Sequence, residues 1–411
     1  MKKILIANRG EIAIRIARTC NDLGIKTVGI FSEDDINSLH LSKMDESFMI
    51  DEKGASAYLN IKKIIAIAKQ EKVDGIHPGY GFLSENPAFA KAAKQARLKF
   101  IGPSEKSLTI FGDKSEAKKL ALKLDIPVVR GTQGKTSLKQ ASSFFKDLKK
   151  NSSIVIKAIA GGGGRGMRVV DLESDLKDAM SRASSEAKSA FDSSDLYVEE
   201  YLKNYRHVEI QVLGDGKGQA THMHERECST QRRHQKIIEI APAPGIKKDL
   251  KEKMFDASVA LIQSSKYEGL ATVEFLVNYA KEDYRFIECN ARLQVEHTVT
   301  EAVLGLDLVK AQIQIASGKT LKQLNLEQKN IPEPKGFAIQ SRVNMEVIDS
   351  EGEIKPSGGK FISFDLPSGP GVRSDSYGYS GYETNPAFDS LIAKVIPHSP
   401  EDNFKQALKR N

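Results

Sequence analysis

Residues 156–170 read "IKAIAGGGGRGMRVV", where four consecutive glycines, Gly161–Gly164, separate two apolar runs. Consecutive glycines cost backbone entropy on folding and contribute no packing, so the pattern predicts a β-hairpin with a specialised tip. Glycines expose backbone N–H groups without side-chain obstruction, which suits a flap that closes over phosphates. Lys157 lies among apolar residues and needs an anion beside it, and Arg165 adds charge at the end of the run. The alternative is a surface hairpin with an edge-strand lysine.

The bulk composition limits the class of protein. The chain has 411 residues, of which 40% are hydrophobic, enough for two or three domains with cores. No apolar run approaches the length of a membrane span, and Arg9, Glu11 and Arg15 interrupt the first apolar segment too early for a signal peptide. The three cysteines lie far apart without C-x-x-C spacing, which argues against disulfides and zinc. We therefore expect a cytoplasmic protein with no membrane partner.

The net charge of +7 indicates either a nucleic-acid partner or sites for phosphate-bearing ligands. Lysines are spread along helical stretches such as "KKLALKLD", so most of the excess belongs to a solvated surface. The sequence contains no RNA-binding signature and no zinc-finger spacing. We expect no nucleic-acid partner.

The first 112 residues alternate strand-like and helix-like segments. Strands are predicted at "KKILIAN", "KTVGIF", "VDGIHPG" and "KFIGPS", and helices at "EIAIRIARTCNDLG", "NIKKIIAIAKQEK" and "NPAFAKAAKQAR". Repeated βα units predict an α/β fold with a doubly wound parallel sheet over residues 1–112. The first strand is followed by "ANRGE" instead of G-x-G-x-x-G, which disfavours a dinucleotide site.

The rest of the chain divides into three predicted segments. A lysine-rich linker helix occupies residues 113–131, and a small α+β unit with polar helices occupies residues 132–200 as a mobile lid. Residues 201–411 are strand-rich, from "HVEIQVLGDG" to "GGKFISFDLPSG", and predict an antiparallel sheet. The closing "SPEDNFKQALKRN" reads as the first turns of a helix, so we expect a truncated last domain and a piece of a longer protein.

Two carboxylates and an amide predict a metal site. "ATVEFL" and "RFIECN" read as two strands of a hairpin, which can bring Glu274 close to Glu288, and Asn290 faces the same side as Glu288. Converging carboxylates repel unless a cation lies between them, and oxygen-only ligands suit Mg²⁺ or Mn²⁺ held jointly with substrate phosphates. The alternative is a solvent-facing acidic stripe.

Basic residues gather in two nearby segments. "ARLQVEH" carries Arg292 and then Glu296, a pairing that could hold an anionic substrate and deprotonate it. "CSTQRRHQK" is a second anion-binding candidate, whose charged residues are Arg232, Arg233, His234 and Lys236. A solvated basic loop is the alternative for this second cluster.

Together these segments resemble the ATP-grasp superfamily, and specifically biotin carboxylase. The resemblance covers almost the whole chain, in the family's order, with the strings "IANRGEIAIRI", "YLNI", "IHPGYGFLSEN", "IGPS", "GDK", "GGGGRGM", "RHVEIQV", "ERECSTQRRHQK", "APAPG", "EFL", "QVEH" and "FDSLIAKV". "GYGFLSEN" and "CSTQRRHQK" are the most specific, because other ATP-grasp enzymes share the flap and the metal carboxylates but lack these strings. The implied fold is a doubly wound N-terminal domain, an ATP-grasp lid and a C-terminal antiparallel-sheet subdomain.

The resemblance implies a nucleotide and metal site. Phosphate contacts would come from Lys114 and Lys157, under a flap containing Gly163 and Gly164. The adenine-binding hinge would be Glu199, Glu200, Tyr201 and Leu202, and the nucleotide pocket would be lined by His207, Gln231 and His234. The metal ions would be held by Glu274 and Glu288, with Asn290 in support.

The resemblance also implies the chemistry. Bicarbonate would be bound by Lys236, Arg292 and the Val295 backbone, Glu296 would be the general base, and Arg342 would stabilise the biotin enolate. The implied reaction is ATP-dependent carboxylation of biotin, the first half-reaction of an acyl-CoA or pyruvate carboxylase, with fatty acid biosynthesis among the possible settings. No lysine is flanked by methionines, as in the "AMKM" of biotin carriers, so biotin is expected from a separate carrier protein or domain. A carboxyltransferase and a second copy of the chain, in a homodimer, are the other expected partners.

Three departures from the family pattern stand out. Ile159 and Ala160 precede only four glycines, Glu239 is followed by Ile240 where many relatives have a second acid, and the family continues past residue 411. Two other functions stay open at this point. One is another ATP-grasp carboxylate–amine ligase or half of a carbamoyl-phosphate synthase, and the other is a non-catalytic nucleotide-binding module.

Overall fold

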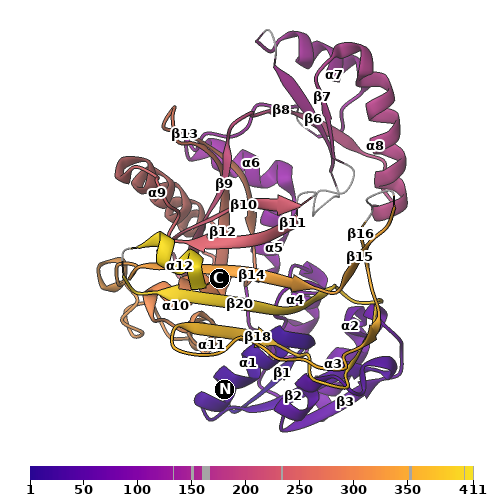
Figure 1. The fold of residues 1–411 in the computed structure, drawn as a ribbon, viewed down its shortest axis with the longest axis vertical. Helices are drawn as coiled ribbons and strands as arrows, with labels where there is room; N and C mark the ends of the chain where they lie inside the picture. Colours follow the sequence, from indigo (N-terminus) through magenta and orange to yellow (C-terminus); the bar gives the residue numbers. More distant parts are fainter. Residues whose placement is uncertain are drawn as a thin grey trace.

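The computed structural model describes residues 1–132, 134–149, 152–159, 167–232, 235–350, 354–401 and 403–410. Among these residues, a parallel N-terminal sheet and a long antiparallel sheet form the body of the molecule, and a small third sheet with two helices stands away from it (Figure 1). This arrangement confirms the predicted combination of a parallel α/β domain, a lid and an antiparallel C-terminal part. None of the described helices has the length and apolar character needed to cross a membrane.

The N-terminal sheet is doubly wound, as predicted. Its strand order is β3-β2-β1-β4-β5 and every neighbouring pair is parallel: β1 (Lys3–Ile6), β2 (Lys26–Ser32), β3 (Glu46–Ile50), β4 (Gly75–His77) and β5 (Lys99–Phe100). Alternate residues of β1 enter different cores: Ile4 and Ile6 pack with helix α1 (Gly10–Asp22), while Leu5 packs in the cluster that holds α3 (Ile61–Gln70) and α4 (Pro87–Gln95). Helices therefore cover both faces.

Two short helices complete this part, α2 (Ala55–Leu59) and α5 (Glu105–Gly112), and helix α6 (Lys114–Lys123) leads to the lid. The start of α6 is set by Asp113, whose Oδ1 accepts hydrogen bonds from the backbone N–H groups of Ser115 and Glu116 at 2.8 and 3.1 Å. This cap satisfies N–H groups that the first turn leaves without partners. It also fixes Lys114 at the first position of the helix, beside the cleft described below.

The lid has its own core. Its sheet has the order β7-β6-β8, with β6 (Ser153–Ala158), β7 (Arg168–Val170) and β8 (Leu196–Tyr201), and its helices are α7 (Leu138–Lys146) and α8 (Leu176–Phe191). Strands β6 and β7 pair antiparallel, which confirms the predicted hairpin, although the glycine tip lies outside the described residues. The buried cluster around Ile154, Ile156 and Val198 shares no residue with the body's clusters.

The large antiparallel sheet runs in the order β13-β12-β9-β10-β11-β14-β20-β18. Its strands are β9 (Arg206–Asp215), β10 (Ala220–Arg232), β11 (Gln235–Ala241), β12 (Glu268–Asn278), β13 (Asp283–Asn290), β14 (Phe337–Asn344), β18 (Val372–Ser376) and β20 (Leu391–Ser399). The helices packed against it are α9 (Lys248–Ser264), α10 (His297–Leu304), α11 (Leu308–Ala316) and the terminal α12 (Phe404–Arg410). One hydrogen-bonded sheet thus joins the strands before residue 291 to the strands after residue 336.

The strand predicted from "GGKFISFDLPSG" is wrong beyond its first residues. Only β17 (Gly359–Lys360) forms, paired with β19 (Glu383–Thr384), and a small hairpin of β15 (Glu346–Ile348) and β16 (Ile354–Pro356) precedes it. Ile362 is 97% exposed, because no sheet lies beside this segment to bury it. Phe361 and Phe364 pack instead against each other and near Tyr382, with their ring centroids 4.9 Å apart.

Candidate active site

One cleft of about 530 Å³ collects the predicted site residues. It lies between the lid strands and one face of the large sheet, where residues of β9, β11, β12, β13 and β14 line it. Within the described part of the chain, the nucleotide, metal, bicarbonate and biotin residues implied by the resemblance all line it: Lys114, Lys157, Glu199, Glu200, Tyr201, Leu202, His207, Gln231, Lys236, Glu274, Glu288, Asn290, Arg292, Val295, Glu296 and Arg342. Arg232 of the second basic segment does not line the cleft and pairs with Glu346 instead. Gly163, Gly164 and His234 lie outside the described residues.

Lys236 is at the centre of this cleft. Its Nζ lies 2.5 Å from Glu209 Oε2, 2.9 Å from Glu274 Oε1 and 2.8 Å from Glu296 Oε1. Burial opposes the charge of this ammonium, but the three carboxylates outweigh it and raise the pKa of Lys236 well above its ordinary value. Lys236 is therefore a fixed positive charge, available to an anion that displaces one of these carboxylates.

Glu296 receives cations from two sides. Its Oε1 faces Lys236, and its Oε2 accepts a hydrogen bond from Arg342 Nη2 at 3.1 Å. Burial alone would raise the pKa of Glu296, but the charges of Lys236, Arg342 and Arg226 lower it. The carboxylate is thus ionised at neutral pH, and its pKa would rise if Lys236 or Arg342 moved away from it.

Arg342 and Arg226 are held by glutamates within the sheet. Arg342 Nε donates to Glu239 Oε1 at 2.6 Å, and Glu239 is completely buried. Arg226 Nε donates to Glu209 Oε1 at 2.6 Å, and both of these side chains are also completely buried. Sequence reasoning gave no role to Glu209 or Arg226. A glutamate among the apolar residues of "HVEIQV" is the same signal that pointed to Glu274, and it could have identified Glu209.

The predicted metal carboxylates are partners across β12 and β13. Glu274 and Glu288 are Cα neighbours in register, and Asn290 Nδ2 donates to Glu274 Oε1 at 2.8 Å. Burial would raise the pKa of Glu274, but Lys236 and His207 hold it well below its ordinary value; His207 Nε2 lies 2.9 Å from Glu274 Oε2. Glu288 faces Lys114 at 3.4 Å. Two carboxylates with an amide oxygen nearby are a donor set that fits Mg²⁺ or Mn²⁺.

The lid lysine predicted to contact phosphate has an anionic partner. Lys157 Nζ lies 2.5 Å from Glu199 Oε2, and Lys118 of α6 pairs with the other oxygen of the same carboxylate. Glu199 on β8 therefore links the lid strand β6 to the body. A phosphate oxygen would compete with Glu199 for Lys157, because both offer negative charge to the same ammonium.

Arg292 is oriented by the N-terminal domain. Its Nε donates to Glu85 Oε2 at 2.8 Å, and the backbone N–H of Ala291 donates to Glu85 Oε1 at 3.2 Å. Burial lowers the pKa of Arg292, but Glu85 outweighs it and raises the pKa. Glu85 belongs to "GYGFLSEN", so this string supplies a contact of the site even though it lies far from the other site residues in sequence.

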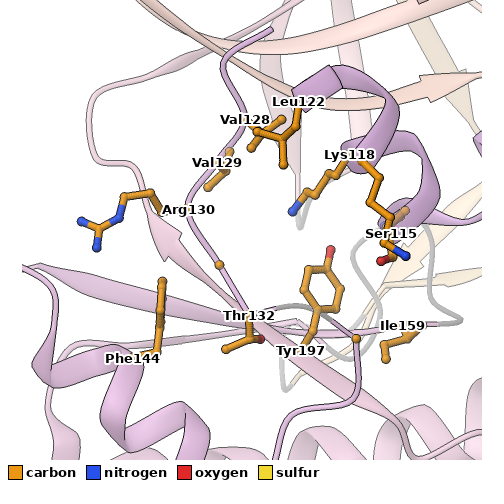
Figure 2. Close-up of a pocket in the computed structure, with 14 residues that line it drawn as sticks. Ser115, Lys118, Leu122, Val128, Val129, Arg130, Thr132, Phe144, Ile159 and Tyr197 are labelled. Atoms are coloured by element: carbon orange, nitrogen blue, oxygen red, sulfur yellow. The ribbon is translucent and has the colours of Figure 1, made fainter. Parts of the chain in front are cut away.

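A second cavity, of about 370 Å³, lies between α6 and the lid. Figure 2 shows Leu122, Val128 and Val129 of the body on one side of it, with Tyr197 and Thr132 of the lid on the other. It shares Lys114 and Val129 with the larger cleft. Open space therefore lies between the lid and the body beside residues 128–132, where the chain passes from α6 into the lid.

Three family models match the chain. They describe the biotin carboxylase N-terminal domain over residues 1–108, the ATP binding domain of the carbamoyl-phosphate synthase L chain over residues 113–324, and the biotin carboxylase C-terminal domain over residues 340–411. Biotin carboxylase 1 of Bacillus subtilis is 43% identical over 97% of this chain and 87% of its own length. Pyruvate carboxylase of Staphylococcus aureus is 45% identical over 99% of this chain. The chain spans 35% of that enzyme's length.

Solved structures agree with these sequence matches. The biotin carboxylase of Campylobacter jejuni, solved as a β-γ-ATP complex, has a TM-score of 0.93 and 39% identity, over 100% of this chain and 89% of that one. The biotin carboxylase domain dimer of Hydrogenobacter thermophilus 2-oxoglutarate carboxylase, in complex with MgADP, ADP and bicarbonate, also has a TM-score of 0.93 and 39% identity, over 100% and 88% of the two chains. On the evidence of its fold, its cleft and these matches, the chain belongs to the biotin carboxylase family.

Proposed function

We propose that the chain catalyses the ATP-dependent carboxylation of biotin, with bicarbonate as the source of the carboxyl group and biotin presented by a carrier protein or domain. One observation carries this proposal. Lys236, Glu296 and Arg342 form a connected group beside the Glu274 carboxylate in the cleft that also contains the lid lysine Lys157. Such a group can bind a small anion, remove its proton and receive a second substrate that acquires negative charge.

In the first step, bicarbonate binds to Lys236, Arg292 and the Val295 backbone, and Glu296 accepts its proton. The bicarbonate oxygen attacks the γ-phosphate of ATP, which gives carboxyphosphate and ADP. Lys114 and Lys157 hold the phosphates in line for this attack, and Glu199 to Leu202 hold the adenine. When Lys236 turns from Glu296 to bicarbonate, the pKa of Glu296 rises, so the carboxylate becomes a base at the moment its substrate arrives.

In the second step, carboxyphosphate divides into CO₂ and phosphate. The proton on the ureido nitrogen of biotin is removed by phosphate, or by Glu296 after it has passed the bicarbonate proton to phosphate. The resulting enolate attacks CO₂ to give carboxybiotin. Arg342 stabilises the negative charge that develops on the ureido oxygen, in the manner of an oxyanion site. Glu239 keeps the guanidinium in place for this task, because its Oε1 accepts from Arg342 Nε.

Glu274 and Glu288, with Asn290 in support, would hold Mg²⁺ or Mn²⁺, and the bound metal would neutralise phosphate charge during transfer. We infer that the chain consists of an N-terminal domain (1–112), a linker helix (113–131), a lid (132–200) and a C-terminal part (201–411). The lid closes on the nucleotide, and the other three parts form the body against which it closes. Closure would exclude water, which otherwise hydrolyses carboxyphosphate. The separate lid core and the open cavity beside the hinge support such a motion.

We also propose the larger enzyme in which the chain acts and its oligomeric state. A biotin carrier and a carboxyltransferase would complete an acyl-CoA or pyruvate carboxylase, and two copies of the chain would pair, as in the dimer described for the 2-oxoglutarate carboxylase domain. A cytoplasmic location is supported by three buried cysteines that form no disulfide.

ATP turnover with and without bicarbonate and free biotin tests this function. We expect ADP release that requires bicarbonate, slow formation of carboxybiotin from free biotin, and no streptavidin signal from the purified chain. Free biotin should be a poor substrate, because the carrier's binding energy normally positions the ureido ring. Turnover supported by ammonia but not by biotin would replace this proposal with a carbamoyl-phosphate synthase or carboxylate–amine ligase activity.

A further inference from the structure

Lys394 is a completely buried lysine in β20, the strand next to β14. It lies opposite Arg342 of β14 on one side and Asp375 of β18 on the other. An ammonium without access to water needs negative charge and hydrogen-bond acceptors around it. The groups that contact Lys394 therefore indicate the structural role of its charge.

Among the described residues, two groups lie within hydrogen-bond distance of the Lys394 ammonium, and the Asp375 carboxylate also interacts with its charge. Glu11 Oε1 lies 2.9 Å from Nζ, and the carbonyl oxygen of Val295 accepts a hydrogen bond from Nζ at 3.1 Å. The same Glu11 oxygen also accepts from the hydroxyl of Tyr80. Glu11 comes from the first turn of α1 and Tyr80 from "GYGFLSEN", so the N-terminal domain supplies the counter-charge for a lysine that supports the Val295 backbone.

The Val295 carbonyl belongs to the peptide group that joins Val295 to Glu296. Its orientation fixes the backbone from which the Glu296 side chain projects toward Lys236. The preceding peptide group is held in a similar way, because His297 Nδ1 donates to the carbonyl of Gln294 at 2.7 Å. Burial, together with the Lys394, Arg15 and Arg373 charges, lowers the pKa of His297 well below its ordinary value, so the ring is neutral. Buried side chains thus hold the peptide groups on both sides of Val295.

We propose that Lys394 is a positioning residue for bicarbonate: it holds the Val295–Glu296 peptide group, and with it the backbone from which Glu296 projects, so that the Glu296 carboxylate addresses the same anion as the N–H of the neighbouring Gln294–Val295 peptide group. The inference rests on the proposed function of the cleft. Lys394 does not line the cleft itself, so its effect reaches the substrate through the backbone.

The alternative is that Lys394 only neutralises Glu11 and Asp375, of which Asp375 also pairs with Arg373 at 2.7 Å. The two roles separate in a pair of variants. Lys394→Met removes the cation and leaves the Glu11 carboxylate buried with the Tyr80 hydroxyl, which should lower stability. The double variant Lys394→Met with Glu11→Gln removes both charges, so it should recover most of that stability while the Val295 carbonyl still lacks its donor.

The measurement is ADP release at saturating ATP and Mg²⁺, with bicarbonate varied in carbonate-depleted buffer, alongside thermal unfolding. In the double variant we expect the KM for bicarbonate to rise about tenfold or more, with the KM for ATP within about twofold of the wild type. If the double variant instead regains the wild-type bicarbonate KM, Lys394 serves charge balance only and the inference is wrong. If the single variant does not fold, the bicarbonate KM of the double variant alone distinguishes the positioning role from charge balance.

Lys251→Met is the matched control. Lys251 of α9 pairs with the buried Glu225 at 2.6 Å, and neither residue lines the cleft. Loss of this pair should lower the melting temperature and leave the bicarbonate KM unchanged. A rise in bicarbonate KM equal to that of the double variant would mean that any destabilisation has this effect, and would overturn the inference. Wild-type ADP release that does not depend on bicarbonate would overturn the proposed function itself, a result distinct from either variant outcome.

Discussion

Glu274 lies directly opposite Glu288 across the antiparallel pair of β12 and β13, and its register partner on the other side is Glu209 of β9. Three carboxylates therefore lie in a row across three neighbouring strands. Lys236, Arg226 and Lys114 neutralise them in the absence of ligands. Among the described residues, Glu274 and Glu209 have cationic partners within 2.9 Å, whereas the ion pair of Glu288 with Lys114 is longer, at 3.4 Å. If the cleft holds a metal ion as proposed, Glu288 would be the most available of the three carboxylates.

We predict that Glu288→Gln reduces ATP turnover by about a hundredfold or more, because the amide keeps the shape and removes the charge that metal binding requires. The measurement is ADP release across a range of Mg²⁺ concentrations. Glu282→Gln, in the turn of the same hairpin and paired with Lys247, is the control and should keep wild-type turnover. Near wild-type rates for Glu288→Gln at ordinary Mg²⁺ would contradict the metal assignment.

Arg342→Ala should leave bicarbonate-dependent ATP cleavage measurable and strongly reduce biotin carboxylation, because the proposed charge acts in the second half-reaction. The two activities are measured on the same preparation. Removal of Arg342 also leaves the buried Glu239 without its cation, so the double variant Arg342→Ala with Glu239→Gln separates stability from chemistry. An equal loss of both activities in the double variant would assign Arg342 to the nucleotide or bicarbonate site.

Lys236→Met should destabilise the fold by about 3 kcal/mol at pH 7, because three buried carboxylates lose their shared cation. The pKa values of Glu274 and Glu296 are lowered in the folded protein, so their stabilising contribution is present above the ordinary pKa of about 4.3 and is lost as pH falls through the folded values. The difference in melting temperature between wild type and variant should therefore narrow below pH 4. A constant difference from pH 7 to pH 3 would contradict this coupling; Lys119→Met, an exposed pair with Glu116, is the control.

ATP should increase the protection of lid amides from hydrogen exchange, in β6, in β7 and in the segment from Gly161 to Gly166, while the N-terminal sheet changes little. The buried core of the lid shares no residue with the cores of the body, so the lid can move as a unit when it closes on the ligand as proposed. Exchange measured by mass spectrometry with and without ATP and Mg²⁺ checks this. No added protection in the lid would show that nucleotide binding does not move it.

The sequence predicted the elements whose patterns are local. The β6–β7 hairpin and the pairing of Glu274 with Glu288 follow from short apolar runs, and the parallel N-terminal sheet follows from its repeated βα units. The edge strand β3 was missed, because it is only five residues long and its sequence, ESFMI, does not alternate between apolar and polar residues. The contact of Glu85 with Arg292 could not be derived from spacing, since 207 positions separate these residues and only the packed fold brings them together. The segment after Lys360 looked like a strand, but no neighbouring strand was present to pair with it.

The continuous ladder from β13 to β18 has a consequence for how such a chain tolerates changes in length. Glu209, Glu274, Lys236 and Arg342 come from four of its strands, and side chains alternate between the two faces of a strand. One residue inserted within any of these strands would turn every later side chain of that strand to the opposite face. The site would then be lost outright instead of weakened. Insertions in the turn at residues 279–282 leave the register of β12 and β13 intact, so a turn of different length is compatible with catalysis. An insertion inside either of these two strands, a few residues away, is not.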